Sequence, residues 1–191
     1  MRKRLTVIPV VLGLLVALAA PAQEGPKPIV VYTAWALNML GGGGGTTVTI
    51  GIYRWSSDAE RIALTDVLKT DGNAQMVADL SQLPQVGYIF TQGTLAYALY
   101  YAYQTVNPDG SRKIVCATNR PISFGGSISP GARQKYDLGI LEMHFDKDGK
   151  ASEGKIIGQG MASIDKKTGK VEVNNYDGQP TRLLQIKEQK Q

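Results

Sequence analysis

Residues 95–118 (LAYALYYAYQTVNPDGSRKIVCAT) contain the pattern that decides the fold. Two runs rich in aromatic and β-branched residues, 95–106 and 112–118, flank the tetrapeptide NPDG at 107–110. Runs of this composition predict β-strands, and Asn, Pro, Asp and Gly are the residues of tight turns. The stretch therefore predicts two antiparallel strands joined in a hairpin.

The same alternation of strand-like runs and turns extends in both directions. DKDG at 146–149 and KTGK at 167–170 are further hairpin turns. Neighbouring strands joined by such short links, without a crossover helix, pair antiparallel. We therefore expect an antiparallel sheet of about nine strands, curled into either a barrel or a sandwich, with strands at residues 29–37, 46–55, 86–91, 95–106, 112–118, 136–145, 155–164, 170–176 and 182–187.

One segment interrupts the strand pattern with helical spacing. SDAE at 57–60 is a capping box, in which the Ser hydroxyl and the Glu carboxylate each accept a hydrogen bond from a free backbone N–H. Asp-Gly at 71–72 ends this helix, and Asn73 is placed to cap a second helix, which ends before Pro84. The predicted fold class is thus α+β, mainly antiparallel β, with a helical pair between strands two and three.

The N-terminal 22 residues have the three parts of a secretory signal peptide: basic residues at 2–4, an apolar run, and the small-x-small sequence APA at 20–22. The alternative is a membrane anchor, but the apolar run is short for the roughly 20 residues that a span needs. We expect cleavage after Ala22, then a short tether at 23–28 and a single globular β-rich domain at 29–188. The mature protein would be periplasmic or secreted, with no membrane attachment.

Composition limits the chemistry of the chain. The 191 residues include 21 Lys and Arg, 16 Asp and Glu, one His and one Cys. Three of the basic residues lie in the predicted signal peptide, so the net charge of +5 falls to +2 in the mature chain and nucleic acid is not an expected partner. One His and one Cys give little basis for a zinc site, an iron–sulfur cluster or a disulfide. We expect no metal and no cofactor.

Two motifs resemble binding loops but favour a simpler interpretation. The five glycines at 41–45 precede a predicted strand rather than a helix, so a strand connection is favoured over a phosphate-binding loop. The turn at 146–149 resembles part of a calcium loop, but Lys155 stands where a bidentate Glu is needed. The first motif therefore predicts a connector, and the second predicts a hairpin turn.

The candidate catalytic groups have weak support. Cys116 shares a strand face with Ile114, as a buried structural thiol would, whereas His144 is expected to point to solvent or to a polar face. Glu142 and Asp137 are interpreted as solvated charges on the strand that carries His144. No nucleophile motif surrounds these residues. We predict no catalytic residue, although an enzymatic activity is left open.

Two features favour ligand binding. Tyr97, Tyr101 and Tyr103 share one predicted strand face with Leu99, and such a face suits either a core wall or a ligand cavity. The long irregular stretch at 119–135 has basic residues without intervening acids, so it is either an anion-accepting rim or a solvated loop. The candidate ligand-binding residues are Tyr97, Leu99, Tyr101, Tyr103, Arg120, Phe124 and Arg133.

Four segments resemble those of uncharacterised exported bacterial proteins: 46–58, 84–89 (PQVGYI), 97–102 (YALYYA) and 119–124 (NRPISF). The resemblance covers most of the mature chain. It implies export and a single domain, and it brings no activity, cofactor or catalytic residue.

The leading hypothesis is an exported, non-enzymatic binding module for a small apolar or amphipathic ligand or for an envelope partner. An apolar cavity among Tyr97, Leu99 and Tyr101 would support a small-ligand binder, and a packed interior there would count against one. The alternatives are a cell-envelope structural or assembly protein that acts through a strand edge or the 119–135 loop, and a metal-independent hydrolase, which needs two converging carboxylates.

Overall fold

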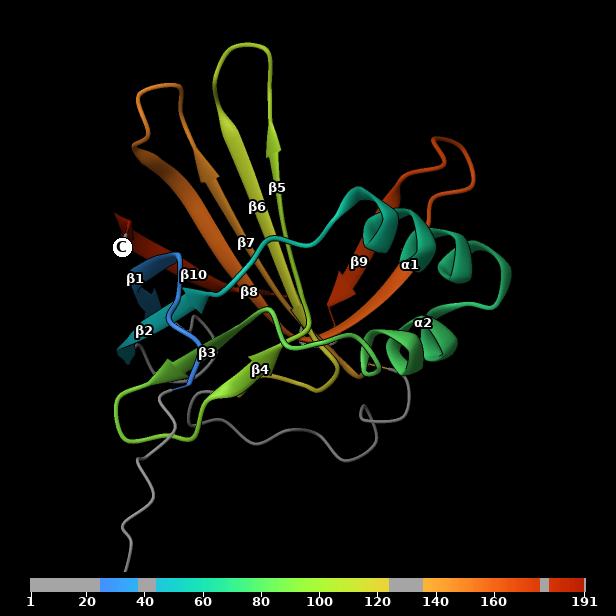
Figure 1. Cartoon of the computed structure of the whole chain (residues 1–191), viewed down its shortest axis with the longest axis horizontal. Coiled ribbons are helices and arrows are strands. Elements are labelled where there is room, and N and C mark those ends of the chain that lie inside the picture. Colours follow the sequence, from blue (N-terminus) through green and yellow to red (C-terminus); the bar gives the residue numbers. More distant parts are fainter. Residues whose placement is uncertain (1–24, 38–43, 124–135, 176–178, 191) are drawn as a thin grey trace, which may run out of the picture.

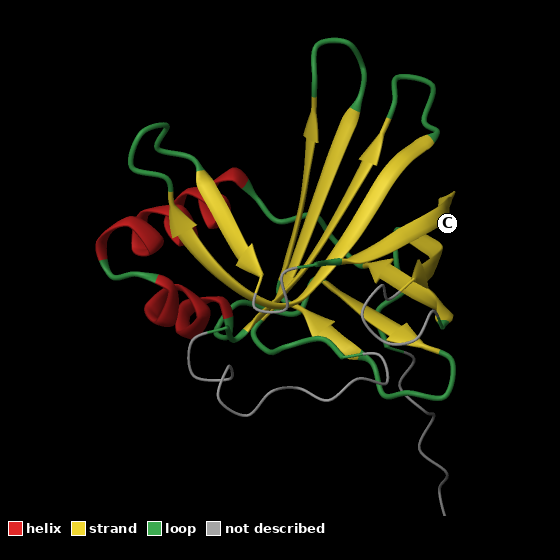
Figure 2. Ribbon diagram, turned by 180° about the vertical axis from the view of Figure 1, so that it is seen from behind, coloured by secondary structure: helices red, strands yellow, loops and turns green. Residues whose placement is uncertain are grey.

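The computed structural model describes residues 25–37, 44–123, 136–175 and 179–190, and most of them belong to one antiparallel sheet (Figures 1 and 2). The predicted α+β class, mainly antiparallel β, is confirmed. The sheet has ten strands: β1 (Val30–Leu37), β2 (Gly45–Ile52), β3 (Gly87–Thr91), β4 (Tyr97–Leu99), β5 (Tyr101–Val106), β6 (Arg112–Thr118), β7 (Leu138–Phe145), β8 (Ala151–Ile164), β9 (Val171–Asn175) and β10 (Thr181–Lys190).

The sheet curls into a nearly closed barrel. Its strand order is β4-β3-β2-β1-β10-β8-β7-β6-β5, and β9 pairs with the far end of β8. The first and last strands of this order, β4 and β5, are consecutive in the chain and separated only by Tyr100. The chain itself therefore joins the two ends of the sheet. Of the two architectures that the sequence left open, the barrel is the one observed.

A bend at Tyr100 divides the single strand predicted at 95–106. The Tyr100 N–H donates to the Ala117 carbonyl oxygen at 3.0 Å, while Tyr101 is the register partner of the same Ala117. Two residues thus oppose one, which is the arrangement of a β-bulge and reverses the alternation of faces. Leu99 packs in the barrel core, whereas Tyr101 packs on the other side of the sheet. Tyr97 therefore shares the inner face with Leu99 as predicted, whereas the predicted placement of Tyr101 and Tyr103 on that face is wrong.

Two helices lie between β2 and β3 in the chain, α1 (Asp58–Thr70) and α2 (Asn73–Leu80), as predicted. The capping box at the start of α1 is confirmed. The Glu60 N–H donates to Ser57 Oγ at 3.2 Å, and the Ser57 N–H donates to Glu60 Oε2 at 2.7 Å. Figures 1 and 2 show both helices on one side of the molecule, next to β9 and the far end of β8.

Asn73 has a different role from the predicted one. Gly72 is the N-cap of α2, and no side chain caps this helix. The Asn73 side chain instead accepts a hydrogen bond from the Ala162 N–H at 2.8 Å and donates one to Asp137 Oδ1 at 2.9 Å. The pairing of β8 with β7 ends at Gly160, so Asn73 satisfies a backbone group of β8 that β7 does not reach.

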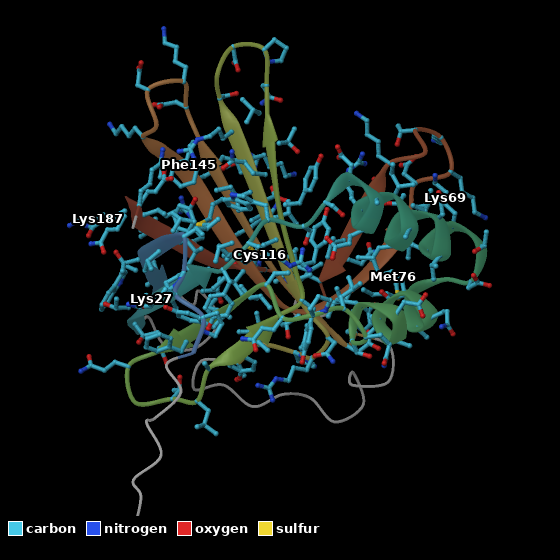
Figure 3. The ribbon with its side chains drawn as sticks, in the orientation of Figure 1. Lys27, Lys69, Met76, Cys116, Phe145 and Lys187 are labelled. Carbon is cyan, nitrogen blue, oxygen red and sulfur yellow. The ribbon has the colours of Figure 1, made fainter. Side chains whose placement is uncertain are left out.

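Apolar side chains form two cores, one on each side of the sheet. The first fills the barrel, where Ile50, Leu99, Ile114 and Cys116 are 0 % exposed. The second lies between the outer face of the sheet and the helices, and its buried members are Leu68, Met76, Val77, Leu80, Leu138, Ile140, Ile157 and Ala162. Figure 3 labels Cys116 and Met76, which mark the two cores.

An ion pair crosses one end of the barrel. Arg112 Nη2 on β6 lies 2.7 Å from Glu188 Oε2 on β10, and both side chains are less than one-fifth exposed. The Arg112 guanidinium lies over the Phe145 ring at 4.7 Å, and Phe145 contacts Tyr32 with ring centroids 5.7 Å apart. Because β7 and β8 separate β6 from β10 in the sheet, the ion pair spans the interior and covers the apolar core beneath it.

Candidate ligand groove

A recess bounded by the described residues lies outside the barrel. It has a volume of about 590 Å³ and lies between the sheet, the two helices and β9. We call it the outer groove. Its floor is the outer face of β5, β6 and β7, with Tyr101, Tyr103, Val115, Ala117, Ile140 and Glu142. Arg61, Leu64, Thr65 and Leu68 of α1 form one wall, and Val171 and Val173 of β9 form another.

The register of the three floor strands arranges their outward side chains in rows. One row is apolar, the next mixes apolar and charged groups, and the third is polar. The rows are Tyr101, Ala117 and Ile140; then Tyr103, Val115 and Glu142; then Thr105, Lys113 and His144. Polarity therefore rises steadily along the floor.

Buried side chains line the groove at its apolar end. Met76 and Leu80 of α2 contribute there together with Leu138 and Ala162 of the sheet, and all four are less than 10 % exposed. At the other end Lys113 and Arg61 are partly exposed, and Thr105 is exposed. The outer groove is thus amphipathic from end to end.

A stacked pair of Tyr rings forms part of the floor and is tied to α1. The rings of Tyr101 and Tyr103 lie 6.1 Å apart with an interplanar angle of 15°. The Tyr103 hydroxyl donates to Asp58 Oδ1 at 2.6 Å, and the Arg61 guanidinium lies 5.3 Å from the Tyr103 ring centroid. Burial raises the pKa of Tyr101, so its hydroxyl stays neutral at physiological pH.

Glu142 carries the negative charge of the groove floor. Its Oε2 lies 3.0 Å from Lys113 Nζ, and its Oε1 lies 2.7 Å from His144 Nε2 and 3.4 Å from Lys155 Nζ. Burial alone would raise the pKa of Glu142, but hydrogen bonds to His144 and Lys113 and the nearby lysine charges outweigh it, so the pKa is lowered. Glu142 is therefore an ionised carboxylate that three basic side chains share.

The interpretation of Glu142 as a solvated charge is wrong. Its side chain is only 16 % exposed, because it lies on the groove floor between Lys113 on β6 and Lys155 on β8. Asp137 also has a tertiary partner, the Asn73 amide. Pairing between strands distant in sequence produces both environments, and strand alternation does not report it.

The predicted ligand-binding residues separate into distinct places. Tyr101 and Tyr103 line the outer groove, whereas Leu99 is fully buried in the barrel.

Tyr97 packs against the barrel core. Its hydroxyl donates to the Ser123 carbonyl oxygen at 3.0 Å, and the Arg120 guanidinium lies 4.7 Å from its ring centroid. Phe124 and Arg133 lie outside the described residues. The interior around Leu99 is packed, which counts against the ligand cavity considered among Tyr97, Leu99 and Tyr101. The outer groove is a different recess, on the other face of the sheet.

Sequence reasoning did not identify Lys113, Val115 and Ile140 as groove residues. A usable signal was present in residues 112–118, where the face opposite Ile114 and Cys116 carries Val115 and Ala117 as well as Lys113. A strand whose second face is also partly apolar is typical of a sheet covered on both sides. That covering here comes from α1, α2 and β9.

The thiol and the imidazole lie on opposite faces of the sheet. Cys116 is inside the barrel and burial raises its pKa to about 12, so the predicted buried thiol is confirmed. His144 lies on the outer face beside Glu142, as the alternation predicted. Cys116 is therefore neither ionised at neutral pH nor within reach of His144.

The turn-like motifs behave as connections. At 146–149 the Asp146 side chain accepts hydrogen bonds from the Asp148 and Lys150 N–H groups, and Gly149 has φ +78°. This is a hairpin turn between β7 and β8. The glycines at 41–43 lie outside the described residues, but the run ends in β2, which pairs antiparallel with β1 as expected of a strand connection.

Two features are absent from the described ranges. These ranges contain no group of three or more His, Cys, Asp and Glu side chains able to hold a metal ion. No helix within them has the length and apolar character needed to cross a membrane. The signal peptide predicted at 1–22 lies outside these ranges and stays a prediction.

In comparisons with known proteins, no family model, curated protein or solved structure matches this chain. The resemblance to exported bacterial proteins stays a prediction that rests on its four segments.

Proposed function

We propose that this chain is an exported, non-enzymatic binding protein and that the outer groove holds a small, elongated, amphipathic ligand. The observation that carries the proposal is the change from the apolar row of Tyr101, Ala117 and Ile140 to the polar side chains of Thr105 and Lys113 along one continuous floor. Export rests on the predicted signal peptide.

The size and lining of the groove support a small organic ligand. Its volume of about 590 Å³ lies within the roughly 300–1,000 Å³ typical of ligand pockets, which are mostly apolar with a few placed polar groups. Each Å² of apolar ligand surface removed from water contributes about 25 cal/mol. The apolar end would supply most of the binding free energy, and the polar end would fix the orientation of the ligand.

The hydrolase alternative finds less support in the groove. It needs a second carboxylate beside Glu142, and among the described lining residues Glu142 is the one carboxylate. Its lowered pKa suits a permanent charge rather than a group that exchanges protons near neutral pH.

The assembly alternative would use a strand edge or the 119–135 loop, of which residues 124–135 lie outside the described residues. Among the described strands, β4, β5 and β9 each pair with one neighbour and have three, six and five residues. The exposed positions of β9 include Glu172 and Asn174. Short edge strands with charged side chains are poor templates for pairing with another chain. Binding of a small ligand therefore explains more of the structure.

The proposal is tested by titrating the purified protein with the neutral fluorophore N-phenyl-1-naphthylamine. We expect saturable binding that Ala117→Phe weakens at least tenfold, because the new ring occupies the apolar end of the groove. Ala63→Phe is the matched control, since Ala63 lies on an exposed part of α1 and should leave binding unchanged.

Thermal unfolding checks that each variant is folded, and Val115→Trp replaces Ala117→Phe if the latter does not fold. Absence of binding to the native protein, or equal binding by a folded floor variant and by the native protein, contradicts the proposal.

A further inference from the structure

We propose that the ligand of the outer groove is a single-chain amphiphile with an anionic head group, which Lys113 and Arg61 hold at the polar end. This inference rests on the proposed function and specifies the chemistry of the ligand. Both side chains line the groove, one from β6 in its floor and one from α1 in its wall.

The acidic groups near this end of the groove are already satisfied. Glu142 shares its charge among Lys113, Lys155 and His144. The carboxylate of Asp58 accepts the Tyr103 hydroxyl at 2.6 Å and faces Arg61 at 3.4 Å. A cationic head group would have to displace one of these contacts before it could pair with either carboxylate.

The basic groups have donor capacity beyond their contacts with Glu142 and Asp58. A Lys ammonium has three N–H donors and an Arg guanidinium has five. The structure directs Lys113 to one oxygen of Glu142, at 3.0 Å, and Arg61 to one oxygen of Asp58 through two long contacts of 3.4 and 3.5 Å. An anion placed between Lys113 and Arg61 would add hydrogen bonds to both without breaking those already made.

The apolar floor beneath them strengthens this preference. Tyr103 and Val115 occupy the row next to Lys113, and Arg61 lies over the Tyr103 ring. A head group here has an apolar surface on one side and water on the other, so its hydrogen bonds are screened less than those of a freely exposed pair. The acyl chain would then extend over Ala117 and Ile140 toward Leu138 and Met76.

Lys155 provides the matched control for the test. It contacts Glu142 at 3.4 Å, as Lys113 does at 3.0 Å, but it does not line the groove. Replacing either Lys perturbs the ion pairs of Glu142, and only replacement of Lys113 removes a group that faces the ligand.

The experiment measures, by isothermal titration calorimetry at monomeric ligand concentrations, the binding of dodecanoate, dodecanol and dodecyltrimethylammonium, which share a twelve-carbon chain. We expect dodecanoate to bind at least tenfold more tightly than either of the others. Lys113→Met should weaken dodecanoate binding about tenfold, as expected for one charge-assisted hydrogen bond, and should change dodecanol binding less than twofold. Lys155→Met should change neither by more than twofold.

Each other outcome has a distinct meaning. Three results would contradict the anionic head group without contradicting binding in the groove. They are equal binding of dodecanoate and dodecanol, tighter binding of the cationic amphiphile, and equal losses of dodecanoate binding in Lys113→Met and Lys155→Met. If none of the three amphiphiles binds, the proposed function itself fails. If Lys113→Met does not fold, Arg61→Met takes its place with the same expected selectivity.

Discussion

The two faces of β6 and β7 meet very different surroundings. On the inner face Ile114, Cys116, Leu141 and Met143 are all 0 % exposed and form part of the barrel core. On the outer face the side chains that alternate with them form the floor of a groove of about 590 Å³. The same two strands thus contribute to a packed core with their inner face and to an open groove with their outer face.

The difference also concerns how each side is held together. Backbone hydrogen bonds around the sheet and apolar packing hold the barrel. The helical side of the molecule, which consists of α1, α2 and β9, is attached to the barrel in part by individual hydrogen bonds. The Ser56 N–H donates to the Ala102 carbonyl oxygen at 2.6 Å, and the Ala162 N–H donates to Asn73 Oδ1 at 2.8 Å. We expect the helices and β9 to open locally at a lower free energy than the barrel, as ligand-binding regions commonly do.

The largest expected effect is on the free energy of unfolding, and it comes from truncating one side chain on each face of the sheet. Leu141→Ala should lower the free energy of unfolding by about 3 kcal/mol, because it leaves a cavity in a packed core. Val115→Ala, on the partly exposed floor, should lower it by about 1 kcal/mol or less. Urea unfolding measures both, and losses of equal size would show that the outer face is packed as tightly as the inner one.

An intermediate effect is expected where α2 joins the sheet. Asn73→Ala should lower the free energy of unfolding by about 1–2 kcal/mol, since the Ala162 N–H and Asp137 lose their partner. Hydrogen exchange should increase in α2 and β9 but not in β1 and β2. Asn107→Ala at an exposed turn is the control and should cost about 0.5 kcal/mol or less. Uniform exchange across all four elements would contradict the separate opening of the helical side.

The smallest effect is a pH dependence at the start of α1. The bidentate contact with Arg54, opposed by burial and aided by the Ser57 N–H, lowers the pKa of Glu60 from 4.5 to about 2. A carboxylate with a lower pKa in the folded state stabilises it above the unfolded pKa, and this contribution is lost as the pH falls from about 4.5 to 2.

Glu60→Gln should therefore lower the free energy of unfolding by about 1 kcal/mol at pH 7, and the difference from the native protein should disappear near the folded pKa. Urea unfolding between pH 7 and pH 2.5 measures this. Arg54→Met removes the main cause of the low pKa and should give a similar profile. An unchanged difference at every pH would show that Glu60 acts as a cap without a charge contribution.

Much of the secondary structure could be predicted because it depends on neighbours in sequence. The turns at 107–110 and 146–149 and the capping box at 57–60 are local arrangements, and each is observed. The bend at Tyr100 could not be predicted in this way. It arises because Leu99 pairs with Gly87 on β3 while Tyr101 pairs with Ala117 on β6.

The candidate site was predictable only in part. Tyr101 and Tyr103 belong to the groove, whereas Leu99 belongs to the barrel core. The interpretation of Glu142 changed most, from a solvated charge to a largely buried carboxylate. Two of its three basic partners lie on β6 and β8, and only the sheet register brings them beside it.

The sequence by itself determined a two-faced antiparallel sheet with a helical pair inserted between its second and third strands. Strand periodicity, turn residues and helix caps act over a few residues, so they can be recognised without knowledge of the fold. Only the tertiary structure decided that the sheet curls into a nearly closed barrel, and that α1, α2 and β9 leave a groove on its outer face. These features depend on contacts between residues far apart in the chain, because the groove exists only where three strands, two helices and a hairpin meet.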